Sequence, residues 1–518
     1  MFRWLREYVW PRIGSPRAAI ALLSVVHFAI PFAYLAGGAT RINAFLTNDD
    51  TYYYLETAWN ARQLGFVTFD GINPTNGVQF LWFSILYGLS FLTDDKFAFL
   101  TMASTLSVVL TCLPYFIIWR FSSDTWQSPR SLLAGVMALL WLVICLYPSN
   151  RYLVGLESPL HAFLIWMIVL QYTRVYLQVT QGSVRSSSVL FFAVLLVLNT
   201  WTRLDSFGLS ASFLALLLFT VAGRLTIAMY AVVAVIIGIG TVVLFAFFEL
   251  AGGSLLPVSA LVKGYGVDRF SLGSFYNWSL VLFPLRIPGA NLLNVLGIVA
   301  MFGSLGILLR MRTVAHDHHE AALRLIALAL SASVIIHSIV TFGMFRYYYF
   351  WYLSATFVYW TIVLAIFSVD VIRRRAWSYR ATGVSGVVLG VLLVCFWWLG
   401  ATPNNLAATR YEVANWMNAN LEEDSIVGSF NAGQLGFFSE RPVVNLDGLI
   451  NDVTYFEDVI QDESPEALLT YMDHVGIDYL VDYQFGRWHE LIERHFTTVQ
   501  EFPLASGGVV KVMKRAPP

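Results

Sequence analysis

Apolar residues in this chain gather into long runs that are separated by short polar stretches. Many of these runs reach the roughly 20 residues that an α-helix needs to cross a bilayer. The pattern predicts eleven membrane-spanning helices, at residues 18–38, 97–119, 131–147, 159–177, 188–201, 207–222, 226–250, 291–311, 323–343, 347–370 and 381–401. Composition agrees, because 57% of the residues are hydrophobic and only 13% are charged, whereas soluble domains carry about 25% charged residues. We therefore expect an all-α polytopic membrane protein, and a water-soluble globular protein of this size is excluded.

The apolar run at residues 79–92 is too short for a span. As a helix it would be about 21 Å long, whereas the hydrocarbon core of a bilayer is about 30 Å thick. We predict an interfacial or re-entrant helix here. Alternating loops then place most basic residues of the membrane region, including Arg373–Arg375, on the cytoplasmic side, as the positive-inside rule requires. We expect a multi-pass protein of the plasma (inner) membrane, with a cytoplasmic N-terminus and an external C-terminus.

Residues 402–518, called the tail below, differ from the rest of the chain. They hold 7 Lys and Arg residues against 18 Asp and Glu residues. Strands are predicted at 425–430, 442–446, 478–482 and 508–513, and helices at 406–420 and 465–475. We predict two domains. The membrane domain covers residues 1–401, with a first external loop at 39–96, and the tail is a small soluble α/β domain outside the membrane.

Two adjacent carboxylates, Asp49 and Asp50, follow the first predicted helix on the external side. Acids this close repel each other, which raises the pKa of one of them and suits a general base or a metal ligand. The residues also fit a simpler interpretation, in which Asn48-Asp49-Asp50 caps a helix over residues 52–64. Both interpretations stay open from the residues alone.

Further charged groups lie on the external side, where charges held near lipid are costly and usually functional. Arg151 and Glu157 follow the third predicted helix, and they either reach a substrate or pair with each other. Arg203 and Asp205 lie in a very short turn between two short helices. That place suits the phosphate of a lipid, although Arg203 could equally snorkel while paired with Asp205.

Two more basic residues complete the external set. Lys263 lies in the long loop at 251–290 and either binds phosphate or stays solvated. Arg346 interrupts an aromatic belt at 345–352, where Tyr347 is a second candidate. Basic side chains beside a departing phosphate would stabilise its growing negative charge.

The order of these short motifs resembles the GT-C superfamily of polytopic glycosyltransferases, which use polyprenyl-phosphate-linked sugars, and within it a bacterial-type branch. The resemblance covers most of the chain. It runs through Asp49-Asp50, Phe69-Asp70-Gly71-Ile72-Asn73-Pro74-Thr75-Asn76-Gly77, Gly155-Leu156-Glu157-Ser158, Arg203-Leu204-Asp205, Leu256-Pro257-Val258-Ser259, Arg346-Tyr347, Phe430-Asn431-Ala432-Gly433 and Asn445-Leu446-Asp447-Gly448. Residues 78–82 depart from it, because the branch would place a histidine and a proline before Trp82.

The resemblance implies a role for each candidate. Asp49 and Asp50 would be catalytic, and they could also organise a divalent metal, Mg or Mn. The donor phosphate would be bound by Arg203, Lys263 and Arg346. Substrate contacts would come from Asn76, Arg151, Glu157, Asp205 and Tyr347.

We therefore predict a membrane glycosyltransferase that transfers a sugar, with inversion, from a polyprenyl-phosphate-linked donor to an extracytoplasmic acceptor hydroxyl. The acceptor is a glycan, a lipid or a protein, and the other partners are the lipid-linked donor and the bilayer, with no nucleic acid. Two alternatives remain. A transporter or flippase of lipid-linked sugars would need a polar pathway to both faces, whereas the polar clusters lie on one side. A non-catalytic membrane scaffold that presents the tail would explain the acidic domain but not the charged groups held near lipid.

Overall fold

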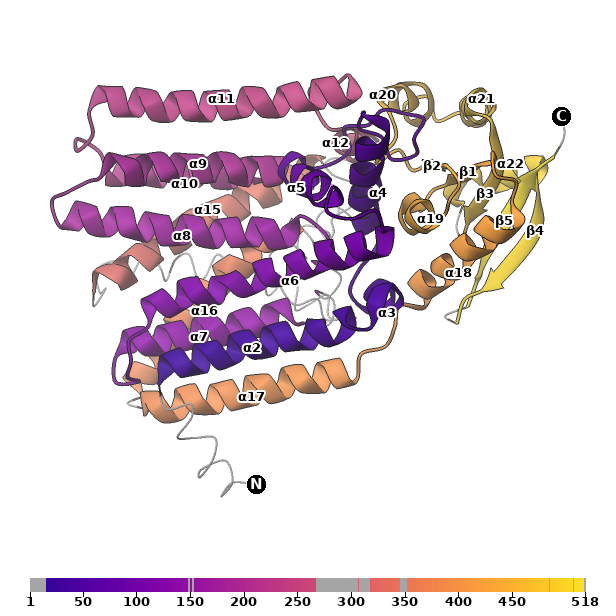
Figure 1. The fold of residues 1–518 in the computed structure, drawn as a ribbon. Helices are drawn as coiled ribbons and strands as arrows, with labels where there is room; N and C mark the ends of the chain where they lie inside the picture. Colours follow the sequence, from indigo (N-terminus) through magenta and orange to yellow (C-terminus); the bar gives the residue numbers. More distant parts are fainter. Residues whose placement is uncertain are drawn as a thin grey trace.

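The computed structural model describes residues 15–147, 150, 153–266, 306, 317–344, 352–375, 377–483, 485–505 and 507–516. A bundle of long helices carries the tail at one of its ends (Figure 1). Within the described ranges, seven helices are long and apolar enough to cross a membrane. They are α2 (Pro16–Leu35), α6 (Lys96–Phe121), α8 (Ser158–Thr180), α11 (Ile227–Gly252), α15 (His318–Met344), α16 (Ser354–Arg374) and α17 (Tyr379–Leu399). The chain is a multi-pass membrane protein.

In the part of the chain that the structure describes, three shorter apolar helices also belong to the bundle: α7 (Pro129–Cys145), α9 (Ser186–Thr202) and α10 (Phe207–Thr220). Each coincides with a predicted span but is shorter than the seven long helices. The predicted span at 291–311 lies outside the described residues. The prediction of a helical membrane domain is therefore confirmed, whereas the number of eleven spans is not.

Short helices gather at the end of the bundle that faces the tail. They are α3 (Gly38–Phe45), α4 (Asp49–Leu64), α5 (Phe80–Ser90) and α12 (Val258–Gly264). Helix α4 runs across the direction of the long helices (Figure 1). Helix α5 is the short helix predicted at 79–92. This layer lies between the bundle and the tail, and it carries many of the polar candidates from the sequence.

The tail is built on one mixed sheet of five strands in the order β2-β1-β3-β5-β4. Strand β1 pairs in parallel with β2 and β3, while β5 is antiparallel to β3 and β4. The strands are β1 (Ile426–Ser429), β2 (Val443–Asn445), β3 (Ile477–Asp482), β4 (Phe496–Pro503) and β5 (Val509–Arg515). Four strands match the predicted ones, and β4 was not predicted.

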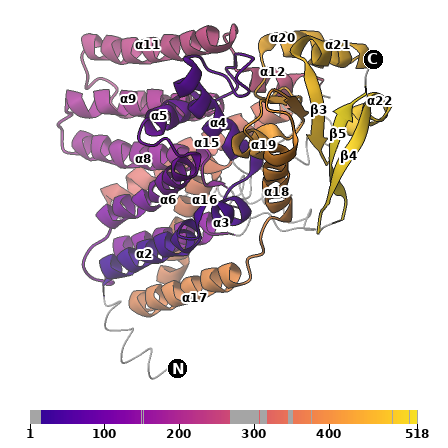
Figure 2. The same ribbon diagram turned by 45° about the vertical axis from the view of Figure 1, so that its right-hand side comes forward.

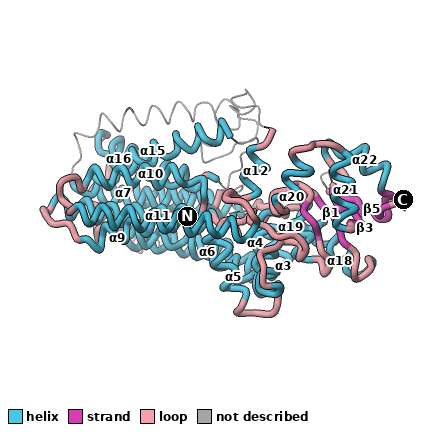
Figure 3. The backbone as a smooth tube through the Cα atoms, turned by 90° about the horizontal axis from the view of Figure 1, so that it is seen from above, coloured by secondary structure: helices cyan, strands magenta, loops and turns pink. Residues whose placement is uncertain are grey.

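Helices cover the tail sheet, and they are α18 (Asn405–Asn420), α19 (Ala432–Phe438), α20 (Val453–Tyr455), α21 (Pro465–Val475) and α22 (His489–His495). Figure 2, turned by 45°, shows α18 and α19 between the sheet and the bundle. Figure 3 shows from above that the tail continues the long axis of the bundle.

One hydrophobic core runs from the bundle into the tail. Tyr52 of α4 packs against Phe437 and Phe438 of α19, with ring centroids 5.2 and 5.1 Å apart. Buried residues such as Val427 and Val481 of the sheet belong to the same apolar cluster as the bundle helices. Because burial of apolar area favours association, this shared core fixes the tail against the layer of short helices.

Candidate functional site

The two adjacent acids at the start of α4 face different surroundings. Asn48 is the N-cap of this helix, because its side chain accepts the backbone N–H of Thr51 at 3.1 Å. Asp49 and Asp50 are therefore the first two helical residues, and successive side chains on an α-helix point about 100° apart. Asp49 faces the tail, whereas Asp50 lines a pocket. The capping interpretation thus holds for Asn48 and leaves both carboxylates to other partners.

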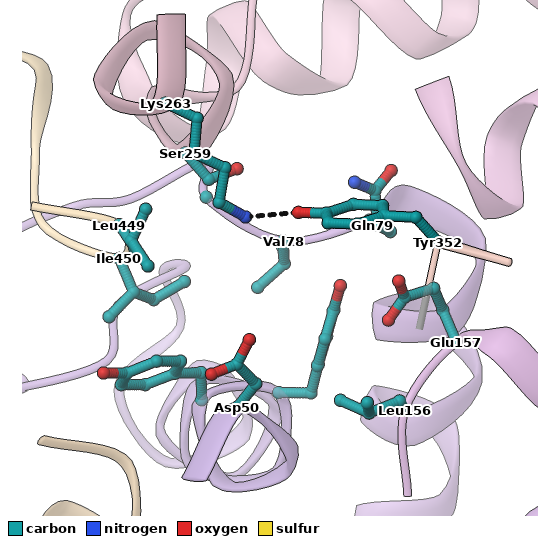
Figure 4. Close-up of a pocket in the computed structure, with 13 residues that line it drawn as sticks. Asp50, Val78, Gln79, Leu156, Glu157, Ser259, Lys263, Tyr352, Leu449 and Ile450 are labelled. Atoms are coloured by element: carbon teal, nitrogen blue, oxygen red, sulfur yellow. Dashed lines mark hydrogen bonds between the residues drawn. The ribbon is translucent and has the colours of Figure 1, made fainter. Parts of the chain in front are cut away.

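The pocket beside Asp50 has a volume of about 50 Å³ and lies where α4, α12 and the tail meet. Figure 4 shows Asp50 entering it from α4 and Lys263 from the opposite side, with Glu157 on a third side. Leu449 and Ile450 of the tail close the remaining wall. The tail is therefore part of this pocket.

Two carboxyls near the pocket have raised pKa values. Burial raises the pKa of Asp50 to about 7; Lys263 opposes this rise, whereas the charges of Asp49 and Glu157 add to it. Burial also raises the pKa of Asp447 to about 7, and the charge of Asp50 contributes. A carboxyl with a pKa near 7 is matched to accepting a proton at neutral pH.

Lys263 is held at the pocket by one hydrogen bond of its own and by the anchoring of its helix. Its ammonium donates a hydrogen bond of 2.7 Å to the hydroxyl of Tyr352. Burial opposes the charged form, but Tyr352 and the Asp50 carboxylate raise the pKa of Lys263 above its ordinary value, so the group is cationic. Asn76 fixes the helix that carries it: the Asn76 side chain accepts the backbone N–H of Val258 at 2.7 Å and donates to the carbonyls of residues 248, 254 and 256.

Arg203 lies at the centre of a buried ionic cluster. Its side chain is 1% exposed and is paired with Glu157, while two further nitrogens donate to Asp205 at 2.9 and 2.6 Å. The guanidinium carbon also lies 4.4 Å from the centroid of the Tyr352 ring. Two carboxylates already neutralise this arginine. Lys263 therefore carries the positive charge that faces the pocket from the described residues, and Arg203 orients Glu157 and Tyr352.

An apolar groove of about 540 Å³ adjoins the pocket. Gln79, Ser259, Lys263 and Tyr352 line both spaces, so the groove and the pocket meet at these four residues. Most of the groove wall is apolar, with Leu256, Pro257, Leu261, Ile336 and Val340 among its residues. Because apolar walls bind apolar chains, this arrangement suits a ligand with a hydrocarbon portion and a polar head.

The structure brings together many of the candidates predicted from sequence. Asp50, Glu157 and Lys263 share the pocket, and Arg203 and Asp205 lie beside it on the groove. Asp49 and Asn76 lie close by, with their side chains bonded to other parts of the chain. Arg151, Arg346 and Tyr347 lie outside the described residues.

Three contributors were missed by sequence reasoning: Tyr352, Gln79 and Asp447. Tyr352 stands in the aromatic belt, where nothing distinguishes it from its neighbours. Gln79 appeared only as part of a departure from the bacterial pattern. Asp447 is separated from Asp50 by almost 400 residues, and only the folded tail brings the charges of the two within reach of each other.

The predicted divalent metal is not confirmed by the groups that the structure describes at this site. Among the described residues, no three His, Cys, Asp or Glu side chains converge in a way that could hold a metal ion. The Asp49 carboxylate already accepts two backbone N–H groups and pairs with an arginine.

Comparisons with known proteins agree on the architecture. An oligosaccharyltransferase, AglB from Archaeoglobus fulgidus, solved with an inhibitory peptide and a dolichol-phosphate, is 12% identical with a TM-score of 0.54 over 98% of this chain and 74% of its own. ArnT from Cupriavidus metallidurans in the apo state is 11% identical with a TM-score of 0.55, over 95% of this chain and 97% of its own. The chain has a GT-C fold.

A second structure of ArnT, bound to undecaprenyl phosphate, is 12% identical with a TM-score of 0.53, again over 95% of this chain and 97% of its own. Residues 404–514 match a family model described as a domain of unknown function (DUF8728). No curated protein matches the sequence. The GT-C fold thus covers nearly the whole chain, including the tail.

Proposed function

We propose that this protein is a membrane glycosyltransferase that transfers a sugar, with inversion, from a polyprenyl-phosphate donor to an acceptor hydroxyl outside the cytoplasm. One observation carries the proposal. A half-buried carboxyl with a raised pKa, Asp50, and a half-buried cation, Lys263, line one small pocket, and an apolar groove opens from that pocket at Lys263. The GT-C fold supports it, since structures of this fold were solved with dolichol-phosphate and undecaprenyl phosphate.

The proposed reaction is a single displacement at the anomeric carbon. The Asp50 carboxylate accepts the proton of the acceptor hydroxyl while that oxygen attacks the anomeric carbon. The bond between this carbon and the phosphate oxygen breaks, and its electron pair leaves with the polyprenyl phosphate. One attack from the face opposite the leaving group inverts the anomeric configuration.

Charge at the leaving phosphate is balanced by Lys263. The groove receives the hydrocarbon chain, so the phosphate head lies where groove and pocket meet, beside this ammonium and Tyr352. A fixed cation in a buried site stabilises developing negative charge strongly, because water screens it little. Arg346, predicted for the same role, stays a sequence-based proposal.

Sugar transfer with the single variant Asp50→Asn tests this function. Membranes containing the wild type or the variant are supplied with radiolabelled undecaprenyl-phosphate glucose, mannose, galactose and arabinose. We expect transfer by the wild type and a loss of about 100-fold or more in turnover for the variant, with donor binding retained. Equal transfer by both proteins would remove Asp50 from catalysis. Donor movement across the membrane without transfer would instead favour the transporter alternative.

A further inference from the structure

Asp49 is bonded to the tail through three separate donors. The backbone N–H groups of Gly433 and Gln434 donate to its carboxylate at 3.2 and 2.9 Å. Arg410 of α18 pairs with the same carboxylate at 3.1 Å. These N–H groups belong to the first turn of α19, where a helix has no internal partner for them. The Asp49 carboxylate therefore satisfies groups of the tail that would otherwise be buried without partners.

The surrounding contacts form one network around Asp49. Gln434 also donates from its side chain to Asn43 at 2.6 Å, and Arg410 donates to the Gln434 side chain at 3.3 Å. Asn43 donates to the Ala407 carbonyl at 2.9 Å. Asn43, Arg410 and Gln434 are at most 5% exposed. We call Asp49, Arg410, Gln434 and Asn43 the clamp.

The packing at Gly433 is too close for any side chain. A Cβ at this position would clash with the backbone carbonyl of Asp49. Helices α19 and α4 are thus in direct backbone contact at the clamp, and this position requires glycine. The hydrogen bonds and the ion pair of the clamp lie in this close contact, where water screens them little, so they are sensitive to any change of geometry.

The clamp is connected to the wall of the pocket. Helix α19 packs against β2, whose last residue, Asn445, donates to the hydroxyl of Tyr53 on α4 at 3.1 Å. The chain then turns through Asp447 to Leu449 and Ile450, which line the pocket opposite Glu157. The same helix, α4, therefore holds both the clamp and the residue that lines the pocket, Asp50.

We propose that Asp49 is a positioning residue that clamps the tail onto α4 and so seats the segment 447–450 as one wall of the pocket, while Asp50 alone of the two acids performs the chemistry. This inference rests on the proposed function. Under this proposal the tail helps to form the site, because docking of the tail determines the shape of the space in which the acceptor meets Asp50.

Three variants and one control test the clamp. Asp49→Asn keeps the size of the side chain but loses the ion pair with Arg410, and Arg410→Gln removes the same pair from the other side. Asp50→Asn leaves the clamp intact. Lys514→Gln is the matched control, since it removes a basic residue of the tail whose exposed pair with Glu422 lies away from the clamp.

Hydrogen–deuterium exchange of the full-length protein in detergent measures how stably the clamp holds the tail, and it needs no substrate. In Asp49→Asn and Arg410→Gln we expect amide exchange in the segment 430–438 to accelerate about tenfold or more, because local opening becomes easier. Asp50→Asn and Lys514→Gln should keep wild-type exchange. Unchanged exchange in both clamp variants would overturn the proposal.

Kinetics with the donor that the wild type accepts give the second readout. Asp49→Asn should raise the donor KM and lower kcat/KM by about tenfold, and the pH at which activity rises should move down, because the charge of Asp49 helps to raise the pKa of Asp50. Arg410→Gln should show the same changes in KM and kcat/KM, but its rise in activity should move to higher pH, because Arg410 lowers the pKa of Asp50. Asp50→Asn should lose turnover. Loss of turnover in Asp49→Asn with normal exchange would identify Asp49 as catalytic and refute the positioning role. If the wild type transfers no sugar, the proposed function fails, and exchange alone still decides the clamp.

Discussion

Lys263 and Tyr352, separated by 89 positions in the sequence, are joined by a hydrogen bond of 2.7 Å that crosses the top of the pocket. The bond aims the ammonium at the place where groove and pocket meet. Tyr352 also stacks on Arg203, so one aromatic ring orders two basic side chains. This relationship explains how a lysine on a seven-residue helix is held at a defined position.

Tyr352→Phe removes this hydrogen bond and keeps the ring. We expect kcat/KM for sugar transfer to fall about tenfold, the equivalent of about 1.4 kcal/mol, because Lys263 loses its orientation relative to the leaving phosphate. Steady-state kinetics in membranes measure this. Tyr230→Phe is the control, since Tyr230 lies in the first turn of α11, at the end of that helix away from α12, and its hydroxyl donates to the backbone carbonyl of Val221. A Tyr352→Phe enzyme with full activity would show that Lys263 needs no such support.

The pH dependence of transfer should follow the ionisation of Asp50. Its pKa is raised to about 7, and only the deprotonated carboxylate can accept a proton. We therefore expect kcat/KM to fall about tenfold per pH unit below pH 7 and to level off above it. A flat profile between pH 5 and 8 would contradict this assignment.

Asp447→Asn should shift that profile. The charge of Asp50 is one of the causes that raise the pKa of Asp447. Because repulsion between two charges is mutual, an ionised Asp447 also disfavours the ionisation of Asp50. Removing the charge lowers the pKa of Asp50, so the rise in activity moves to lower pH. The pH profile of the variant is compared with that of Lys514→Gln. Movement toward higher pH would show that Asp447 stabilises the ionised form of Asp50 instead.

Arg203→Met should destabilise the protein more than Glu157→Gln does. The first change leaves two buried carboxylates, Glu157 and Asp205, without their counter-ion, which costs about 3–5 kcal/mol. The second leaves Arg203 paired with Asp205. Thermal unfolding in detergent, followed by tryptophan fluorescence, compares the two variants. A smaller loss of stability for Arg203→Met than for Glu157→Gln would show that the two buried carboxylates do not depend on Arg203 as their counter-ion.

Gly77→Ala should displace the tail from the pocket. A Cβ at this position would clash with the backbone carbonyl of Leu449. Either the pocket wall at Leu449 moves or the strain destabilises the protein by about 1–3 kcal/mol. We expect lower kcat/KM and faster hydrogen exchange at residues 445–451. Gly88→Ala on α5 is the matched control, because a Cβ there meets nothing within 4 Å. Equal behaviour of the two variants would show that the wall tolerates displacement.

The sequence by itself determined the membrane architecture. Apolar runs of spanning length and the low charge content are sufficient for that, because lipid tolerates few unpaired charges. The acidic composition and short strand patterns of residues 402–518 also predicted a separate α/β fold. The sequence did not determine the number of spans, since α7, α9 and α10 are shorter than the hydrocarbon core requires.

Only the tertiary structure decided how the external polar residues divide their roles. Asp49 and Asp50 are equivalent in the sequence, and the 100° between successive helical side chains turns one to the tail and the other to the pocket. Arg203 is occupied by two carboxylates from different segments. Local sequence patterns carry no information about contacts between residues hundreds of positions apart, such as the contacts that join the tail to α4. These contacts form only when the shared apolar core brings the tail and α4 together.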